Sequence, residues 1–326
     1  MTSGTLGPRQ ESLAGAPIVY DRVQRRPAPQ LQARDLEIMR ALWRYDFLTT
    51  SQIGAEWWAG CHHSRPQIRL AELTGAGLLT RFRPLVRRGT HQWIYQLARA
   101  GFREAQRCYG PDGAYIDETL RWSERRAVDM RAVEHELRVN EWMLAYRRVV
   151  GGRVVDWLGR REARAAPAEA ERDPQTEAMA VAPDAAALIE LNPRSAPLEL
   201  LVELEREERP VRLAERLRRY DALLSEWWRS VPRFRLGERA PAVLFVAPSY
   251  RNAERLLRAA DVELVKPAPE GAVPPAQAEA PAREQALFCA EPDVQRGSLR
   301  AWMLPAQPPG ARGSEDFTAR EVRLPG

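Results

Sequence analysis

Residues 64–97 read SRPQIRLAELTGAGLLTRFRPLVRRGTHQWIYQL and change their hydrophobic period half-way along. The first part, 64–74, has the pattern of a helix that ends at Gly75. The segments that follow, 78–83 and 92–97, alternate apolar and polar side chains. This stretch therefore predicts a helix followed by a β-hairpin.

Helical patterns flank this stretch on both sides. Apolar residues recur at helical spacing over 32–45, a short helix follows an N-cap at Thr49, and a further helix is expected over 99–109. Three helices followed by a hairpin is the element order of a winged helix-turn-helix domain, which we expect at 32–108. Residues 1–31 have no apolar periodicity, and this predicts a flexible arm.

The second half predicts a separate α/β domain at 123–260. Its expected order is a long helix, three strands, a helix, a strand and a helix, with a loop insertion at 160–180. The Pro/Ala-rich segment 267–282 predicts a disordered linker, 286–305 returns to the second domain, and 306–326 predicts a flexible tail. The fold class is therefore α+β or α/β, with an N-terminal winged helix-turn-helix followed by an α/β domain.

The composition excludes several classes of protein. Hydrophobic residues make up 44% of the 326 positions, which suffices for packed cores, and no apolar run approaches the ~18 residues of a membrane span. No charged-then-apolar leader opens the chain, and three cysteines are too few and too scattered for a disulfide framework or a thiolate zinc site. We therefore expect a cytoplasmic protein that does not contact a membrane.

Basic residues are concentrated in the first half. The chain has 49 basic and 44 acidic side chains, a net charge of +5, yet nine arginines and two glutamates fall between residues 61 and 110. Lys266 is the only lysine, so arginine supplies the other basic residues. A basic helix and hairpin are typical of a surface that binds duplex DNA.

Arginine forks and glutamine amides read guanine and adenine edges, and hairpin arginines can hold phosphates. An arginine-rich solvated face, or a winged helix used to form a homodimer, is the alternative interpretation. The predicted DNA-contacting residues are Ser64, Arg65, Gln67 and Arg69 on the helix and Arg81, Arg83, Arg87 and Arg88 on the hairpin.

Acidic residues follow two neighbouring strands of the predicted second domain. Asp184 comes directly before one strand. Glu203 and Glu205 share a face of the next strand, because strand side chains alternate with period two. Asp184 and Glu203 are candidate ligands of Mg²⁺, which prefers oxygen. The long helix could add Glu134, Glu136 or Glu141, of which Glu136 ranks first because it shares a helix face with Asn140. The alternative is an exposed acidic face that only serves solubility.

The order of several short motifs resembles the replication-relaxation family of plasmid and mobile-element proteins. The resemblance covers most of residues 32–260, and no single motif is specific. The segments that carry it are 36–42 (LEIMRAL), 47–53 (FLTTSQI), 69–79, 135–140 (HELRVN), 183–185 (PDA), 202–205 (VELE) and 216–220 (RLRRY).

The resemblance implies a restriction-endonuclease-like second domain of the PD-(D/E)XK type. Asp184 and Glu203 then match the metal ligands of that type. Glu205 stands where a lysine would orient the attacking water, and Arg216 is the basic residue that precedes the tyrosine of the later motif. Arginine can bind phosphate but is a poor proton donor, so the chain departs here from the pattern of an active nuclease.

These patterns leave three hypotheses about function. The first is a DNA-binding factor for plasmid or mobile-element replication or mobilisation, in a prokaryotic cytoplasm and associated with nucleoid or plasmid, whose nuclease-like domain need not be active. The second is an Mg²⁺-dependent DNA nuclease or nickase that uses Asp184, Glu203, Glu205, Glu136 and Arg216. The third is a winged-helix transcriptional regulator. Of the three hypotheses, the second alone makes the protein an enzyme, a metal-dependent DNA endonuclease.

Overall fold

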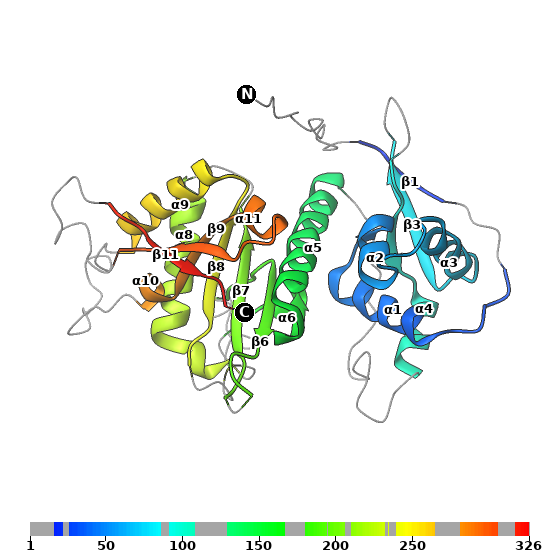
Figure 1. The fold of residues 1–326 in the computed structure, drawn as a ribbon, viewed down its shortest axis with the longest axis horizontal. Coiled ribbons are helices and arrows are strands. Elements are labelled where there is room, and N and C mark those ends of the chain that lie inside the picture. The colour runs from blue at the N-terminus through cyan, green and yellow to red at the C-terminus, as the bar shows by residue number, and fades with distance from the viewer. Residues whose placement is uncertain are drawn as a thin grey trace. The chain divides into compact units, whose positions relative to one another are not determined.

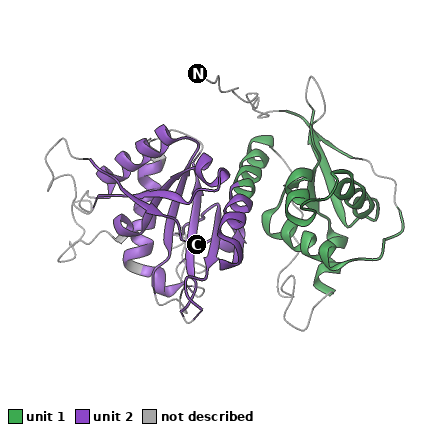
Figure 2. Ribbon diagram, in the orientation of Figure 1, with its two compact units in different colours: residues 1–141 green, residues 142–326 purple. Residues whose placement is uncertain are grey.

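The computed structural model forms two compact units, residues 1–141 and 142–326, drawn in different colours in Figure 2. Both units combine helices with a β-sheet (Figure 1), and this confirms the mixed α+β class. The residues that the structure describes are 16–21, 26–85, 91–107, 129–166, 180–193, 195–205, 210–231, 234, 239–264, 281–305 and 317–325.

Unit 1 combines helices with short strands. Among its described residues the sheet has the strand order β1-β3-β4-β2, and each neighbouring pair is antiparallel. The elements are β1 (Ile18–Tyr20), α1 (Ala33–Tyr45), β2 (Leu48–Thr49), α2 (Thr50–Trp57), α3 (Ser64–Gly75), β3 (Leu79–Pro84), β4 (Ile94–Leu97) and α4 (Arg99–Arg107).

Strand β1 lies inside the segment 1–31, for which the sequence predicts a flexible arm. It pairs with β3 through Ile18 opposite Pro84, and the rings of Tyr20 and Phe82 are 5.3 Å apart. A strand of three residues is too short to show a period of its own. Its conformation is therefore set by the neighbouring strand, and the expectation of a wholly flexible arm is wrong at these residues.

Polar side chains hold the turn between α1 and α2. Thr49 caps α2, because its hydroxyl accepts a hydrogen bond from the backbone N–H of Gln52 at 3.2 Å. The amide of Asn140, on α5 (Met130–Val150), donates to the carbonyls of Tyr45 and Phe47 at 3.1 and 2.8 Å. These two bonds span Asp46, whose φ of 57° lies in the left-handed region. The HELRVN motif thus ends on a residue with a structural role in unit 1.

Gly101 allows α4 to lie directly against the start of the hairpin. A Cβ atom added at Gly101 would lie 2.2 Å from the backbone oxygen of Leu78, which already accepts a hydrogen bond from Ala98 at 3.0 Å. We expect Gly101→Ala to lower the free energy of unfolding by about 2 kcal/mol, because backbone atoms must move apart. Chemical denaturation would measure this change.

The matched control for that substitution is Gly152→Ala. A Cβ atom at Gly152 meets no atom within 4 Å, so we expect this variant to unfold like the wild type. Equal stability of the Gly101 and Gly152 variants would contradict the close approach of α4.

Unit 2 contains a mixed sheet. In its described part the strand order is β11-β10-β9-β8-β7-β6-β5, with β7, β8 and β9 parallel and the remaining neighbours antiparallel. The elements after α5 are η1 (Gly151–Arg153), β5 (Val154–Gly159), α6 (Arg160–Ala163), β6 (Ala185–Ile189), β7 (Leu198–Leu204), α8 (Pro210–Ala222), η2 (Leu223–Trp227), η3 (Trp228–Ser230), β8 (Ala242–Ala247), α9 (Tyr250–Glu263), α10 (Pro281–Gln285), β9 (Ala286–Ala290), α11 (Glu291–Gln295), β10 (Arg300–Met303) and β11 (Arg320–Arg323).

Strand β11 lies inside 306–326, where the sequence predicts a flexible tail. It pairs antiparallel with β10, and Leu324 beyond it is buried. The strand reads REVR, and charged side chains are typical of an edge strand, the position that β11 takes in the sheet. The expectation of a wholly flexible tail is therefore wrong at these residues. Most of the predicted linker 267–282, and residues 167–179 of the predicted insertion, lie outside the described residues.

Candidate functional site

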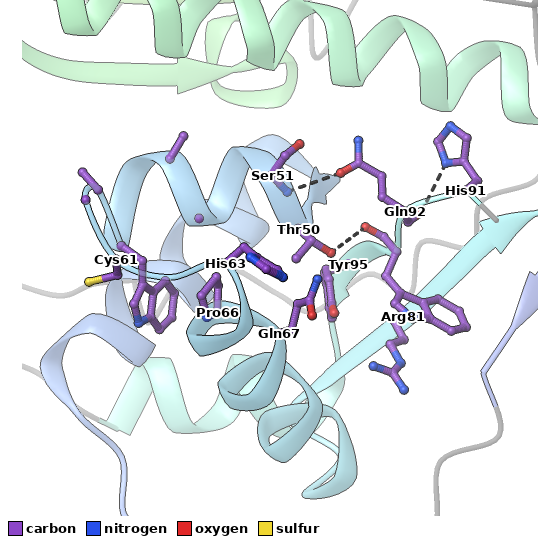
Figure 3. A pocket seen from close by; sticks show the side chains of 16 residues that line it. Thr50, Ser51, Cys61, His63, Pro66, Gln67, Arg81, His91, Gln92 and Tyr95 are labelled. Atoms are coloured by element: carbon purple, nitrogen blue, oxygen red, sulfur yellow. Dashed lines mark hydrogen bonds between the residues drawn. The ribbon is translucent and has the colours of Figure 1, made fainter. Parts of the chain in front are cut away.

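A hollow of about 760 Å³ opens on unit 1 between α2, α3 and the strands of the hairpin. Figure 3 shows Gln67 of α3, Arg81 of β3 and Gln92 ahead of β4 at its wall. The Gln92 side chain accepts a hydrogen bond from the backbone N–H of Ser51 at 3.3 Å and so joins α2 to the hairpin. Cys61, whose thiol is free and exposed, also lines the hollow. The lining thus combines these polar groups with apolar and aromatic side chains such as Trp58 and Pro66.

Helix α3 separates a buried face from an exposed one. Leu70 and Leu73 are fully buried, whereas Arg65 and Gln67 are exposed and Ile68 is 60% exposed. Ser64 is half-buried, and its hydroxyl lies 2.8 Å from a ring nitrogen of His62. Of the residues predicted on this helix, Arg65 and Gln67 thus face outward.

Arg69 is held by unit 1 itself. Its Nε and Nη2 donate to the two carboxylate oxygens of Asp35 at 3.0 and 2.5 Å, and Nη1 donates to Glu72 at 2.8 Å. Asp35 is fully buried, and its hydrogen bond to Arg69 is the main cause that raises the pKa of the guanidinium. Arg69 therefore joins α3 to α1, whereas its contact with DNA stays a prediction.

The two described hairpin arginines share one aromatic ring. The guanidinium carbons of Arg81 and Arg83 lie 4.5 and 4.6 Å from the ring centre of Trp93. Arg81 also forms an ion pair with Asp21 at 2.6 Å. Stacking on an aromatic ring pre-orients the planar guanidinium group. The remaining two predicted hairpin contacts, Arg87 and Arg88, lie outside the described residues.

Three carboxylates of unit 2 come together beside β7. The register Ala185 opposite Val202 places Asp184 across from Glu203. All three acids, Asp184, Glu203 and Glu205, are buried. The backbone N–H of Leu204 donates to Asp184 at 2.9 Å. The predicted convergence of these acids is therefore present in the geometry, and they do not form an exposed acidic face.

Helix α8 brings two side chains onto this acid cluster, which we define as Asp184, Glu203 and Glu205. Arg216 forms an ion pair with Glu205, and its Nη1 lies 3.4 Å from Glu203. The hydroxyl of Tyr220 donates to the other carboxylate oxygen of Glu203 at 2.6 Å. Arg216 and Tyr220 are four residues apart, so both reach the cluster from one face of α8.

The pKa of Glu203 is raised to about 8, chiefly by burial and then by the nearby charge of Asp184, whereas Arg216 and the Tyr220 hydrogen bond oppose this shift. Burial likewise raises the pKa of Tyr220. Glu136 is the remaining residue predicted at this site. It lies on the part of α5 that belongs to unit 1, whereas all the groups that shift the pKa of Glu203 belong to unit 2.

The acid cluster does not fit Mg²⁺ in this arrangement. Both oxygens of Glu203, one of Glu205 and one of Asp184 already face protein donors. Over the described ranges, no group of three or more His, Cys, Asp or Glu side chains is placed to hold a metal ion.

No helix in the described ranges is long and apolar enough to cross a membrane.

Sequence reasoning missed Asp35, Trp93 and Tyr220 as site residues. Asp35 lies far from Arg69 in sequence, and nothing in the chain marks the pair. Trp93 carries no signal beyond being an aromatic residue on a basic hairpin. Tyr220 carried one signal, since the RLRRY motif sets it four residues after Arg216.

The fold and these sites define a two-unit α+β protein with an arginine-bearing helix and hairpin in one unit and a buried acid cluster in the other. The family described as Replication-relaxation matches residues 39–233. The chain belongs to this replication-relaxation family. Comparison with curated proteins found no match, and comparison with solved structures found none either.

Proposed function

We propose that this protein binds duplex DNA through unit 1 and acts in the replication or mobilisation of a plasmid or mobile element. The observation that carries this proposal is the outward face of α3, where Arg65 and Gln67 are exposed and where Gln67 lines the hollow together with Arg81. Membership of the replication-relaxation family supports it. The proposed setting is a prokaryotic cytoplasm, with the protein on nucleoid or plasmid DNA.

The element order of unit 1 supports a winged helix-turn-helix. Helices α1, α2 and α3 precede the hairpin of β3 and β4, with the short strand β2 between α1 and α2. In such domains the last helix before the hairpin enters the major groove. Helix α3 would then read base edges with Arg65 and Gln67, while Arg83 on Trp93 would hold a phosphate.

The experiment is duplex binding at several salt concentrations, first with a pool of random sequence. We expect log K to fall linearly with log salt, and we expect Arg83→Ala to make that slope shallower by about one, because one phosphate contact is lost. The matched control is Arg251→Ala, which removes an exposed arginine from α9 in unit 2. A wild-type affinity that does not respond to salt would exclude the phosphate contacts.

Base reading needs a second measurement, on a duplex selected from the same pool. We expect Arg65→Ala and Gln67→Ala each to weaken binding to that duplex by about tenfold or more, because each bidentate base contact contributes ~1–3 kcal/mol. Their affinity for the random pool should change less. Equal losses on both duplexes would assign α3 to the phosphate backbone only.

A second candidate function is an Mg²⁺-dependent DNA nickase in unit 2, which would require Arg216 to leave the acid cluster before an ion could bind there. The observation in its favour is the convergence of the acid cluster beside a meander of β5, β6 and β7 with β8 parallel to β7, an arrangement compatible with a restriction-endonuclease-like core. Supercoiled plasmid incubated with Mg²⁺ tests it. Nicking that Asp184→Ala and Glu203→Ala both abolish would support the nickase, and nicking unaffected by both would exclude it.

A further inference from the structure

The guanidinium of Arg216 lies between two members of the acid cluster. It forms an ion pair with Glu205 and reaches within 3.4 Å of Glu203. Its side chain is one-third exposed, whereas those of both glutamates are less than one-tenth exposed. The cation thus enters the cluster from helix α8, at the more open side of the site.

The neighbouring donors complete the cluster from the protein side. The hydroxyl of Tyr220 holds one oxygen of Glu203 at 2.6 Å, and the backbone N–H of Leu204 holds one oxygen of Asp184 at 2.9 Å. A divalent ion would have to displace Arg216 before it could reach both glutamates. It would then leave a positive guanidinium beside a doubly charged ion, which repels it.

We propose that Arg216 is the resident cation of the acid cluster and stands in the place that a divalent metal ion would need. Unit 2 then folds with its carboxylates compensated by its own side chain, and a divalent ion adds no stability. Arginine suits this role because its planar fork can contact two carboxylates and stays charged at every physiological pH. The inference concerns unit 2 and does not depend on DNA binding by unit 1.

Removal of this cation should uncover a need for another one. Without Arg216, buried carboxylates would repel one another with no compensating charge. Arg216→Met keeps the length of the side chain and removes its charge. The matched control is Arg219→Met on the same helix, where the arginine is half exposed and pairs with Glu215 one turn away.

Thermal unfolding of the full chain tests the inference. We expect the wild-type Tm to be equal in EDTA, Mg²⁺ and Mn²⁺. We expect the Tm of Arg216→Met in EDTA to fall by about 10 °C and to recover in part with Mn²⁺ or Mg²⁺, while Arg219→Met stays near the wild type. Adding Glu205→Gln to Arg216→Met should recover part of the Tm without metal, because one buried charge is removed.

Two results would overturn the inference. One is an equal Tm of Arg216→Met and Arg219→Met in EDTA. The other does not need Arg216→Met and so keeps the test decisive if that variant does not fold. It is a calorimetric titration of the wild type with Mn²⁺ that shows a bound ion, with the binding lost in Asp184→Asn. No heat of binding in the wild type is the expected result.

Discussion

Asp35→Ala should lower the free energy of unfolding by about 3 kcal/mol, because it breaks a buried ion pair and leaves the other partner in place. Asp35 is fully buried and accepts hydrogen bonds from two nitrogens of Arg69 and from the backbone N–H of Gln32. The substitution removes the acceptor for all three donors. Denaturant unfolding measures the loss.

The control for Asp35 is Glu72→Ala, which removes the outer partner of the same arginine. The side chain of Glu72 is 42% exposed and lies one turn from Arg69 on α3, so we expect a loss below ~1 kcal/mol. Arg69→Lys should fall between the two variants, because a lysine keeps the charge but cannot offer a fork to Asp35. If Asp35→Ala and Glu72→Ala lower the free energy of unfolding by the same amount, the ion pair of Arg69 with Asp35 does not hold α3 to α1.

The second large effect is a fall in stability as the pH rises from about 5 to about 8. The pKa of Glu203 is about 8 in the folded chain, against 4.5 for an ordinary glutamate, because the carboxyl is buried and lies beside Asp184. Between these values the folded state holds a proton that the unfolded state has released. The free energy of unfolding then decreases with rising pH, with a slope approaching ~1.4 kcal/mol per pH unit for one proton.

Glu203→Gln tests this titration. Glutamine keeps an oxygen that can accept from Tyr220 and has no proton to lose, so we expect a flatter stability profile between pH 5 and 8. Glu254→Gln is the control, since Glu254 is exposed on α9 and pairs with Arg258 one turn away. A pH profile of Glu203→Gln that parallels the wild type would assign the slope to another group.

Local patterns predicted the elements that carry their own period or cap. Thr49 marks the start of α2, and the single strand expected between the last two helices of the second domain is β8. Alternation along β7 also predicted that Glu203 and Glu205 share a face, and Arg216 contacts both of them. These features depend on neighbours within one or two turns of chain.

The features that sequence reasoning missed depend on partners far along the chain. Strands β1 and β11 are short and polar or exposed, and their pairing partners, β3 and β10, determine their conformation. The ion pair of Arg69 with Asp35 joins α3 to α1, and no local pattern indicates this pair. The contacts of Arg216 also depend on distant parts of the chain. A basic residue near acids in sequence can bind phosphate or pair with those acids, and the position of α8 places Arg216 against Glu203 and Glu205.

The described cysteines differ in their reactivity toward thiol reagents. Cys61 is exposed at the wall of the hollow in unit 1, whereas Cys289 is buried in β9, and burial raises the pKa of its thiol. With Cys108 replaced by serine, a maleimide dye would therefore modify Cys61 selectively. Such a dye would stand beside the proposed DNA surface without replacing Arg65, Gln67 or Arg83, so its emission would report the arrival of a duplex directly.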